Sequence, residues 1–121
     1  MDTITSHIRN HILLNSGIIK PKKISSLNKL KESEWCQEFE TFMRNRLIMG
    51  AVRYGCLGAQ NKPQYDRCTD MKRRVDLYIN DGNLEHLVDI ANICLCEFVE
   101  GNHPNKHFSA GDDTQHTKRI E

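Results

Sequence analysis

Residues 84–100, LEHLVDIANICLCEFVE, decide the fold, because their apolar side chains recur with the period of an α-helix. One face of this helix carries Leu84, Leu87, Val88, Ala91, Leu95 and Phe98, and Cys94 and Val99 widen it. Asn83 is a suitable N-cap, and Gly101 is expected to end the helix. The apolar face is wide for a chain of 121 residues, which favours burial against a second subunit.

Two amphipathic helices are expected before this one. The first begins at the N-cap Ser33 and ends at Gly55, and its apolar residues at helical spacing are Trp35, Phe39, Phe42, Met43, Leu47, Met49 and Val52. The second has Pro63 at its first position, which suits the fixed φ of proline, and ends at residues 81–83, Asp-Gly-Asn.

The remaining segments are shorter or more polar. Residues 3–15 predict one short helix, and residues 18–31 predict a lysine-rich connector interrupted by Pro21. No stretch alternates with period two, so the fold class is all-α. We expect a small helical bundle of about four helices, completed by oligomerisation, over residues 1–101 and a polar C-terminal tail over residues 102–121.

Composition limits the function classes. Basic and acidic residues number 17 and 16, so net charge gives no reason to expect nucleic acid or an anionic membrane as partner. No apolar run is long enough to span a bilayer, and Asp2 stands where a secretory signal would carry positive charge. The five cysteines form no C-x-x-C pair. We therefore expect reduced thiols and a cytoplasmic location.

Arginine and tyrosine gather on both sides of the loop before Pro63. Arg46, Arg53 and Tyr54 precede this loop, and Lys62 and Tyr65 flank Pro63. Guanidinium groups bind phosphate and aromatic rings stack on bases, so these residues predict a nucleotide site. The alternative is that the arginines lie on a solvated helix face and the tyrosines pack in the core.

Two polar residues stand in the middle of the helix over 84–100. Asp89 and Asn92 are three residues apart, and neither is near an end where capping would explain it. Aspartate can accept from a sugar hydroxyl or hold Mg²⁺, and asparagine can read a base or bridge helices. The alternative is a buried hydrogen bond or an ion pair with Arg46 or Arg53.

The tail supplies three further candidates for ligand contact. His103, Lys106 and His107 could fold over a bound molecule and touch its phosphate. We assign no catalytic residue, because no nucleophile motif, phosphate-binding loop or dinucleotide motif occurs.

Three segments resemble small uncharacterised phage and prophage proteins and, more distantly, the MazG-like all-α nucleotide pyrophosphohydrolases. They are residues 43–55 (MRNRLIMGAVRYG), 62–66 (KPQYD) and 83–104 (NLEHLVDIANICLCEFVEGNHP). The resemblance implies a nucleotide cavity. The enzymes hold Mg²⁺ with E-x-x-E on one helix and E-x-x-D on another. Of the second motif only Asp89 carries over, because His86 stands three residues before it. We expect no E-x-x-E in the chain, because Glu34, Glu38 and Glu40 do not have this spacing.

Three functions follow as hypotheses. The first is a phage-type protein that binds a nucleotide or nucleotide-derived signal and sequesters it without hydrolysis and without a cofactor, in a counter-defence role. The second is a Mg²⁺-dependent nucleoside triphosphate pyrophosphohydrolase with Asp89, Glu85 and Glu38 at its metal site. The third is a protein–protein inhibitor of a host factor.

Overall fold

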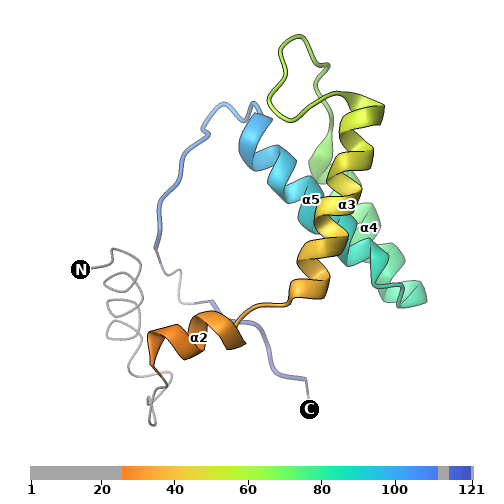
Figure 1. Ribbon diagram of the computed structural model, residues 1–121. Coiled ribbons are helices and arrows are strands. Elements are labelled where there is room, and N and C mark those ends of the chain that lie inside the picture. The colour runs from red at the N-terminus through yellow and green to blue at the C-terminus, as the bar shows by residue number, and fades with distance from the viewer. Residues whose placement is uncertain (1–25, 112–114, 121) are drawn as a thin grey trace. The chain divides into compact units, whose positions relative to one another are not determined.

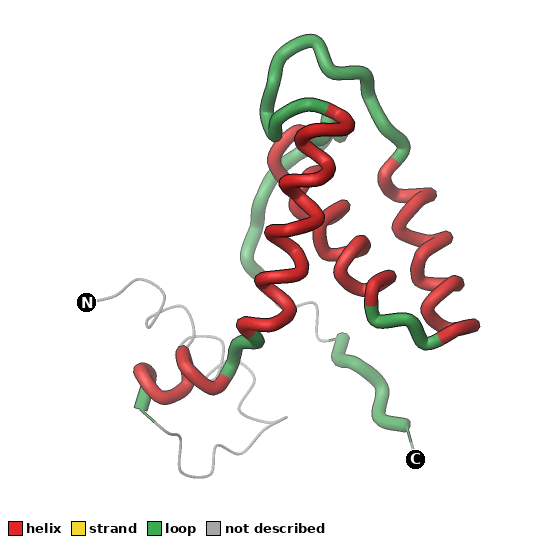
Figure 2. Tube along the Cα trace, turned by 45° about the vertical axis from the view of Figure 1, so that its right-hand side comes forward, coloured by secondary structure: helices red, strands yellow, loops and turns green. Residues whose placement is uncertain are grey.

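The structure is a computed structural model that describes residues 26–111 and 115–120. Within these ranges the chain forms four α-helices and no strand, which confirms the all-α prediction (Figures 1 and 2). The helices are α2 (Leu27–Ser33), α3 (Gln37–Tyr54), α4 (Arg67–Asp81) and α5 (Glu85–Glu100). None of them is long and apolar enough to cross a membrane. The helix expected over residues 3–15 lies outside the described residues.

The chain divides into two compact units. One comprises Cys36–Lys106 and contains α3, α4 and α5; α2 and the described residues from His107 onward belong to the other. We call the unit Cys36–Lys106 the helical unit.

Two helix starts differ from the sequence prediction. Ser33 does not cap α3 but ends α2, a helix that starts after the N-cap Ser26 within the predicted connector. The N-cap of α3 is Cys36, whose Sγ accepts from the Phe39 N–H at 3.5 Å. Helix α2 therefore forms from a serine N-cap followed by the good helix formers lysine, leucine and glutamate.

The start of α4 also differs. Pro63 lies in the loop, and α4 begins at Arg67, because Asp66 caps it. The Asp66 carboxylate accepts from the Thr69 N–H at 3.1 Å and from the Thr69 hydroxyl at 2.7 Å. This double acceptor satisfies an orphan N–H of the first turn, which proline at position 63 cannot do.

The predicted helix ends are confirmed. Gly55 ends α3 with φ of 97°, and Gly82 ends α4 in the left-handed region with φ of 69°. Gly101 ends α5, where an added Cβ would collide with the carbonyl of Glu97. The α5 start lies one residue later than expected, but Asn83 still accepts from the Glu85 N–H at 3.0 Å.

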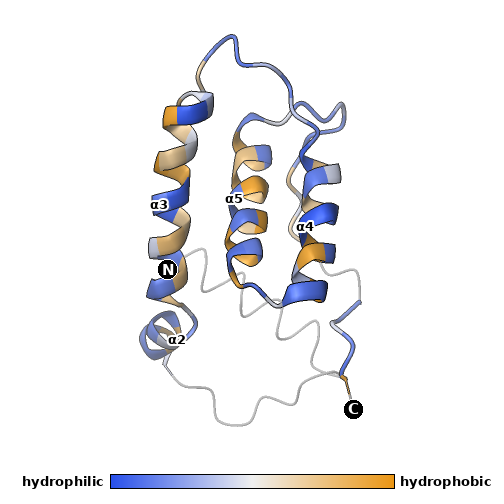
Figure 3. Cartoon of the chain, turned by 90° about the vertical axis from the view of Figure 1, so that its right-hand side faces the viewer, coloured by the Kyte–Doolittle hydropathy of each residue, from blue (hydrophilic) through white to orange (hydrophobic). Residues whose placement is uncertain are grey.

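Helix α5 lies between α3 and α4 and packs against both (Figure 3). Apart from glycine, only Val88 and Asn92 of α5 are buried among the described residues, with 5% and 8% of their surface exposed. The Asn92 amide donates to the Met43 carbonyl of α3 at 3.0 Å. The core is therefore small and centred on one turn of α5.

Replacing Val88 by alanine should lower the free energy of unfolding by about 1–3 kcal/mol, because the methyl groups leave one of the few buried apolar positions. The matched control is Val52→Ala, since 88% of Val52 is exposed, and it should change stability by no more than about 0.5 kcal/mol. Urea unfolding followed by helicity measures both. Equal effects of the two substitutions would contradict the position of the core.

Candidate functional site

A pocket of about 320 Å³ lies where the loop between α3 and α4 meets the end of α5. We call it the loop pocket. Its lining comprises Ala59, Asn61, Lys62, Pro63, Gln64, Tyr65, Arg67, Glu97, Glu100, Gly101, Asn102 and His103. Its volume is at the lower end of the range typical for small-molecule sites.

Lys62 and Glu100 fasten the loop to the end of α5. The Lys62 ammonium donates to the Glu100 carboxylate at 3.1 Å and to the carbonyls of Gly55 and Cys56 at 3.3 and 3.1 Å. These three acceptors match the three donors of an ammonium group. The Gly58 N–H donates to the same Glu100 oxygen at 3.0 Å, and both side chains of the ion pair are 15% exposed.

Arg67 joins two carboxylates at the start of α4. One terminal nitrogen donates to Glu97 at 3.2 Å and the other to Glu100 at 2.5 Å. The hydrogen bond from the Gly58 N–H, followed by those of Lys62 and the charge of Arg67, holds the pKa of Glu100 below its ordinary value, although burial opposes this shift. The charges of two cations and two carboxylates thus cancel on the pocket wall, where Lys62 and Arg67 pair with Glu97 and Glu100.

Two tyrosine rings lie beside this ionic cluster. The Tyr65 ring lines the pocket and is edge-on to the Tyr54 ring, with centroids 6.1 Å apart. The guanidinium of Arg67 lies 5.7 Å from the Tyr65 centroid, and that of Arg53 lies 5.8 Å from the Tyr54 centroid. Each ring is therefore in cation–π range of an arginine, and 41% of Tyr65 stays exposed.

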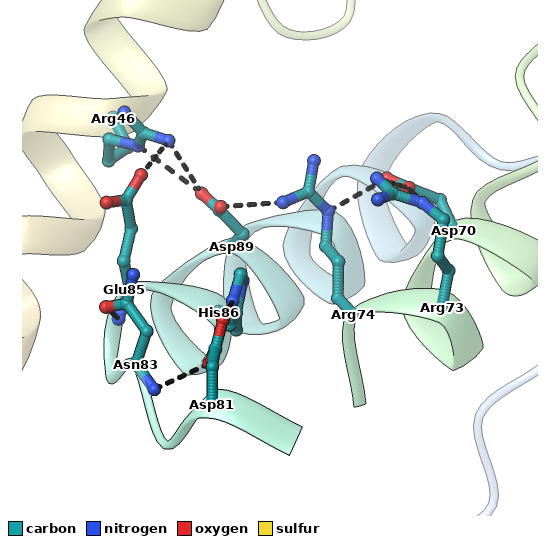
Figure 4. A network of polar contacts seen from close by, with 9 residues as sticks. All are labelled: Arg46, Asp70, Arg73, Arg74, Asp81, Asn83, Glu85, His86 and Asp89. Atoms are coloured by element: carbon teal, nitrogen blue, oxygen red, sulfur yellow. Dashed lines mark hydrogen bonds and ion pairs between the residues drawn. The ribbon is translucent and has the colours of Figure 1, made fainter. Parts of the chain in front are cut away.

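A second polar cluster lies nearer the start of α5 (Figure 4). Both Nε and Nη2 of Arg46 donate to Oδ1 of Asp89 at 3.3 Å, and Arg74 donates to Oδ2 at 2.7 Å. Arg46 also pairs with Glu85 at 2.6 Å. The Asp89 carboxylate, 14% exposed, raises the pKa of Arg46 through these hydrogen bonds and its charge.

The cluster continues along α4. Arg74 donates to Asp70 at 3.1 Å, and Arg73 donates to the other oxygen of Asp70 at 2.8 Å. Burial is the largest single influence and acts to raise the pKa of Asp70, but the two hydrogen bonds and the charges of both arginines together outweigh it, so the pKa is lowered. The ion pairs form a row in which the charges alternate in sign, so each arginine has a carboxylate next to it. The order of this row is Arg46, Asp89, Arg74, Asp70 and Arg73.

The turn between α4 and α5 completes this cluster. Asp81 accepts from the Asn83 N–H at 2.8 Å and pairs with Nε2 of His86 at 3.0 Å. The first of these contacts, helped by the second, lowers the pKa of Asp81. The turn is thereby held by side chains as well as by Gly82.

The predicted site residues fall into separate places. Lys62, Tyr65 and His103 line the loop pocket, and Arg53 and Tyr54 lie beside it through the tyrosine pair. The other predicted residues of the helical unit are Arg46, Asp89, Asn92 and Lys106. His107 belongs to the other unit.

The contacts of these four residues are all within the helical unit. Arg46 and Asp89 form the ion pair that was one of the two alternatives, and Asn92 bridges α5 to α3. The Lys106 ammonium donates to the carbonyls of Val99 and Gly101 at 3.4 and 3.1 Å, so it caps the end of α5.

The sequence reasoning missed Arg67, Glu97 and Glu100. Glu97 and Glu100 form an E-x-x-E pair on α5, so the expectation that the chain has no such motif is wrong. Two carboxylates near the C-terminal end of a helix are unfavourable for the helix dipole, which indicates that cations from elsewhere pair with them. Arg67 and Lys62 are those cations.

Within the described residues, no group of three or more histidine, cysteine, aspartate or glutamate side chains is arranged to hold a metal ion. The carboxylates of the loop pocket and of the Asp89 cluster instead accept from arginine and lysine. A divalent cation at either place would have to displace these partners.

Asp89→Asn should lower the free energy of unfolding by about 1–3 kcal/mol, because it removes the charge to which two arginines from two helices donate. Glu85→Gln is the matched control, since Glu85 also pairs with Arg46 but is 52% exposed, and it should cost less than about 1 kcal/mol. Denaturant unfolding at neutral pH compares them. A larger loss in Glu85→Gln would contradict the central role of Asp89.

Glu100→Gln should remove part of the acid sensitivity of the fold. The pKa of Glu100 is lower in the folded chain than its ordinary value of 4.5, so its stabilising effect is complete above pH 4.5 and is lost as the pH falls through the folded value. At pH 7 the variant should be less stable by about 1–3 kcal/mol, and this difference should shrink in acid. Glu38→Gln, at an exposed position of α3, serves as control. A difference that does not change with pH would contradict the assignment.

No known protein family, curated protein or solved structure matches this chain. The resemblance to phage proteins and MazG-like enzymes stays a prediction.

Proposed function

We propose that this protein binds a nucleotide or nucleotide-derived signal in the loop pocket and sequesters it without hydrolysis. The observation that carries the proposal is Tyr65, an aromatic residue that lines the pocket and is 41% exposed. An exposed aromatic ring beside guanidinium groups is a stacking surface for a base. The neighbouring Tyr54 ring and the Arg67 guanidinium both lie within about 6 Å of the Tyr65 ring centroid.

Polar groups around the ring favour a ligand of low charge. The side-chain amides of Asn61, Gln64 and Asn102 offer donors and acceptors to a base or a ribose. The two cations of the wall already pair with Glu97 and Glu100, so a triphosphate would have to compete with both carboxylates. A cyclic or ADP-ribose-derived nucleotide fits this charge balance better.

The same ion pairs favour binding over Mg²⁺-dependent hydrolysis. Glu97 and Glu100 have the E-x-x-E spacing, but Arg67 binds both. At the other cluster, Arg46 pairs with Glu85 and Asp89, two of the carboxylates of the pyrophosphohydrolase hypothesis. The enzyme hypothesis therefore needs Mg²⁺ to displace arginine at either cluster.

We place this binding in a counter-defence role of a phage-type protein in the cytoplasm of the host cell, where a sequestered signal no longer reaches its receptor. We also propose that the helical unit is completed by self-association. Its buried core is limited to one turn of α5, while large apolar side chains such as Ile79 and Phe98 are 74% and 69% exposed. A domain is stable when its apolar faces are covered by a second layer.

A second candidate function is recognition of a host protein through α3. Phe42, Ile48, Met49 and Val52 are 49%, 66%, 51% and 88% exposed. At 100° per residue, Ile48, Met49 and Val52 lie about 120–180° around α3 from Met43, which contacts α5, and Phe42 lies beside Met49. Such an apolar helix face is typical of a protein–protein contact.

Thermal shift against a panel of cyclic, ADP-ribose-derived and triphosphate nucleotides, with and without Mg²⁺, tests the proposed function. We expect a Mg²⁺-independent shift, with the ligand recovered intact after denaturation of the complex. Tyr65→Ala should weaken binding by about 5- to 150-fold, the loss of about 1–3 kcal/mol of base stacking. Arg53→Ala should weaken it less.

Lys72→Ala, on the exposed surface of α4 and outside the pocket lining, is the control and should bind as the wild type does. Wild-type affinity in Tyr65→Ala would contradict the site. Turnover with Mg²⁺ would favour the enzyme hypothesis, and no shift with any of these nucleotides would favour the protein-binding candidate.

A further inference from the structure

Helix α5 carries an apolar stripe with the spacing of a helix–helix seam. Residues 84, 87, 91, 94 and 98 follow each other at intervals of three, four, three and four, the pattern by which two helices pack along their length. We call these residues, Leu84, Leu87, Ala91, Cys94 and Phe98, the α5 seam. None of them is charged, and Leu84 and Phe98 at its two ends are 68% and 69% exposed.

The seam lies on a side of α5 that its two neighbours cover only in part, since Leu84, Cys94 and Phe98 are exposed and Leu87 and Ala91 are partly exposed. Asn92 and Asp89 hold α3, while Asp89, Glu97 and Glu100 hold α4. At 100° per residue, the seam positions lie outside the arc that these polar residues occupy. The polar contacts and the α5 seam therefore occupy different sides of the same helix.

Helix α4 widens the seam. Cys94 of the seam lies against Met71, with their sulfur atoms 3.3 Å apart. Val75 and Ile79 follow Met71 at intervals of four residues, and they are 43% and 74% exposed. Side chains four apart lie on one side of a helix, so the apolar surface continues from α5 onto α4.

We propose that the α5 seam packs antiparallel against the α5 seam of a second copy of this chain, with Ala91 at the two-fold axis. This inference rests on the self-association proposed above and uses a surface separate from the polar cluster. Leu84 and Phe98 are each seven residues, or about two turns, from Ala91. A two-fold axis at Ala91 therefore places Leu84 of each copy beside Phe98 of the other.

The observations favour a second copy over a different protein. An interface with two-fold symmetry must be complementary to itself, and this seam has its smallest side chain in the middle and large ones at both ends. Alanine at the crossing point lets two helices approach closely, and the antiparallel direction pairs opposite helix dipoles. With a net charge of +1, two copies repel each other little.

The test is the mass of the full-length chain in solution, measured by sedimentation over a series of concentrations. The wild type should be a dimer. Ala91→Glu should be a monomer with unchanged helicity, because it places two carboxylates against each other at the axis. Val52→Glu is the matched control on α3, 88% exposed, and it should remain a dimer.

A charge swap tests the direction. Leu84→Glu and Phe98→Lys should each weaken dimerisation at least tenfold, and the double variant should recover most of the loss through two ion pairs between copies. Both positions are mainly exposed, so these variants test the interface even if Ala91→Glu loses helicity. In a parallel pair, the double variant would bring like charges together and stay a monomer.

The possible failures are distinguishable. A monomeric wild type at the highest concentration overturns both the self-association and the seam. A dimeric wild type whose Ala91→Glu, Leu84→Glu and Phe98→Lys variants are equally dimeric keeps self-association and overturns the seam. A double variant no better than the single ones overturns the antiparallel direction.

Discussion

The carboxylate of Asp89 is the point at which the three helices of the helical unit meet. One of its oxygens accepts from Arg46 of α3 and the other from Arg74 of α4, while Asp89 itself stands on α5. A buried apolar core is nearly absent here, since Val88 is the one apolar side chain among the described residues that is buried. Ionic and amide contacts therefore determine how the helices align, and apolar burial adds little within one copy. Charges at half-exposed positions stabilise a fold modestly, so this unit gains from any further apolar surface that it can cover.

The far end of α5 repeats this arrangement with different residues. Glu97 and Glu100 lie where the helix dipole disfavours negative charge, and Arg67 and Lys62 compensate for it. The same contacts fold the loop over the helix end and so create the loop pocket. The ionic cluster thus has two effects, because it fixes the loop that presents Tyr65 and leaves a pocket wall with no net charge. A ligand that enters gains from stacking and hydrogen bonds more than from charge.

Local signals predicted the helices better than the contacts between them. Glycine at 55, 82 and 101 and the apolar period of residues 84–100 were sufficient to predict three helix ends and the central helix. Ser33 was misleading because it belongs to the last turn of α2, which leaves Cys36 to cap α3. Pro63 was misleading because Asp66 provides two acceptors at the start of α4. Which residue becomes the N-cap depends on which side chain can reach the free N–H groups of the first turn. Residue type alone does not determine the N-cap.

The ion pairs between helices, in contrast, could not be predicted from local sequence signals. Asp89 and Arg46 are 43 residues apart, and Arg67 is 33 residues from Glu100. Such a pairing depends on the path of the loops and on which faces of the helices meet. An aspartate in mid-helix indicated that some partner exists, and the structure identifies Arg46 and Arg74 as its two partners. The carboxylates near the C-terminal end of α5 gave the same kind of signal and were overlooked.

The last turns of α5 connect the loop pocket with the proposed seam. Phe98 of the seam lies between Glu97 and Glu100, whose carboxylates fasten the pocket loop. A second copy that covers Phe98 would therefore contact the same turn of α5 that fastens the pocket loop. Binding free energies are linked reciprocally, so any effect of a ligand on self-association is matched by an equal effect of self-association on ligand binding, although the two surfaces do not overlap.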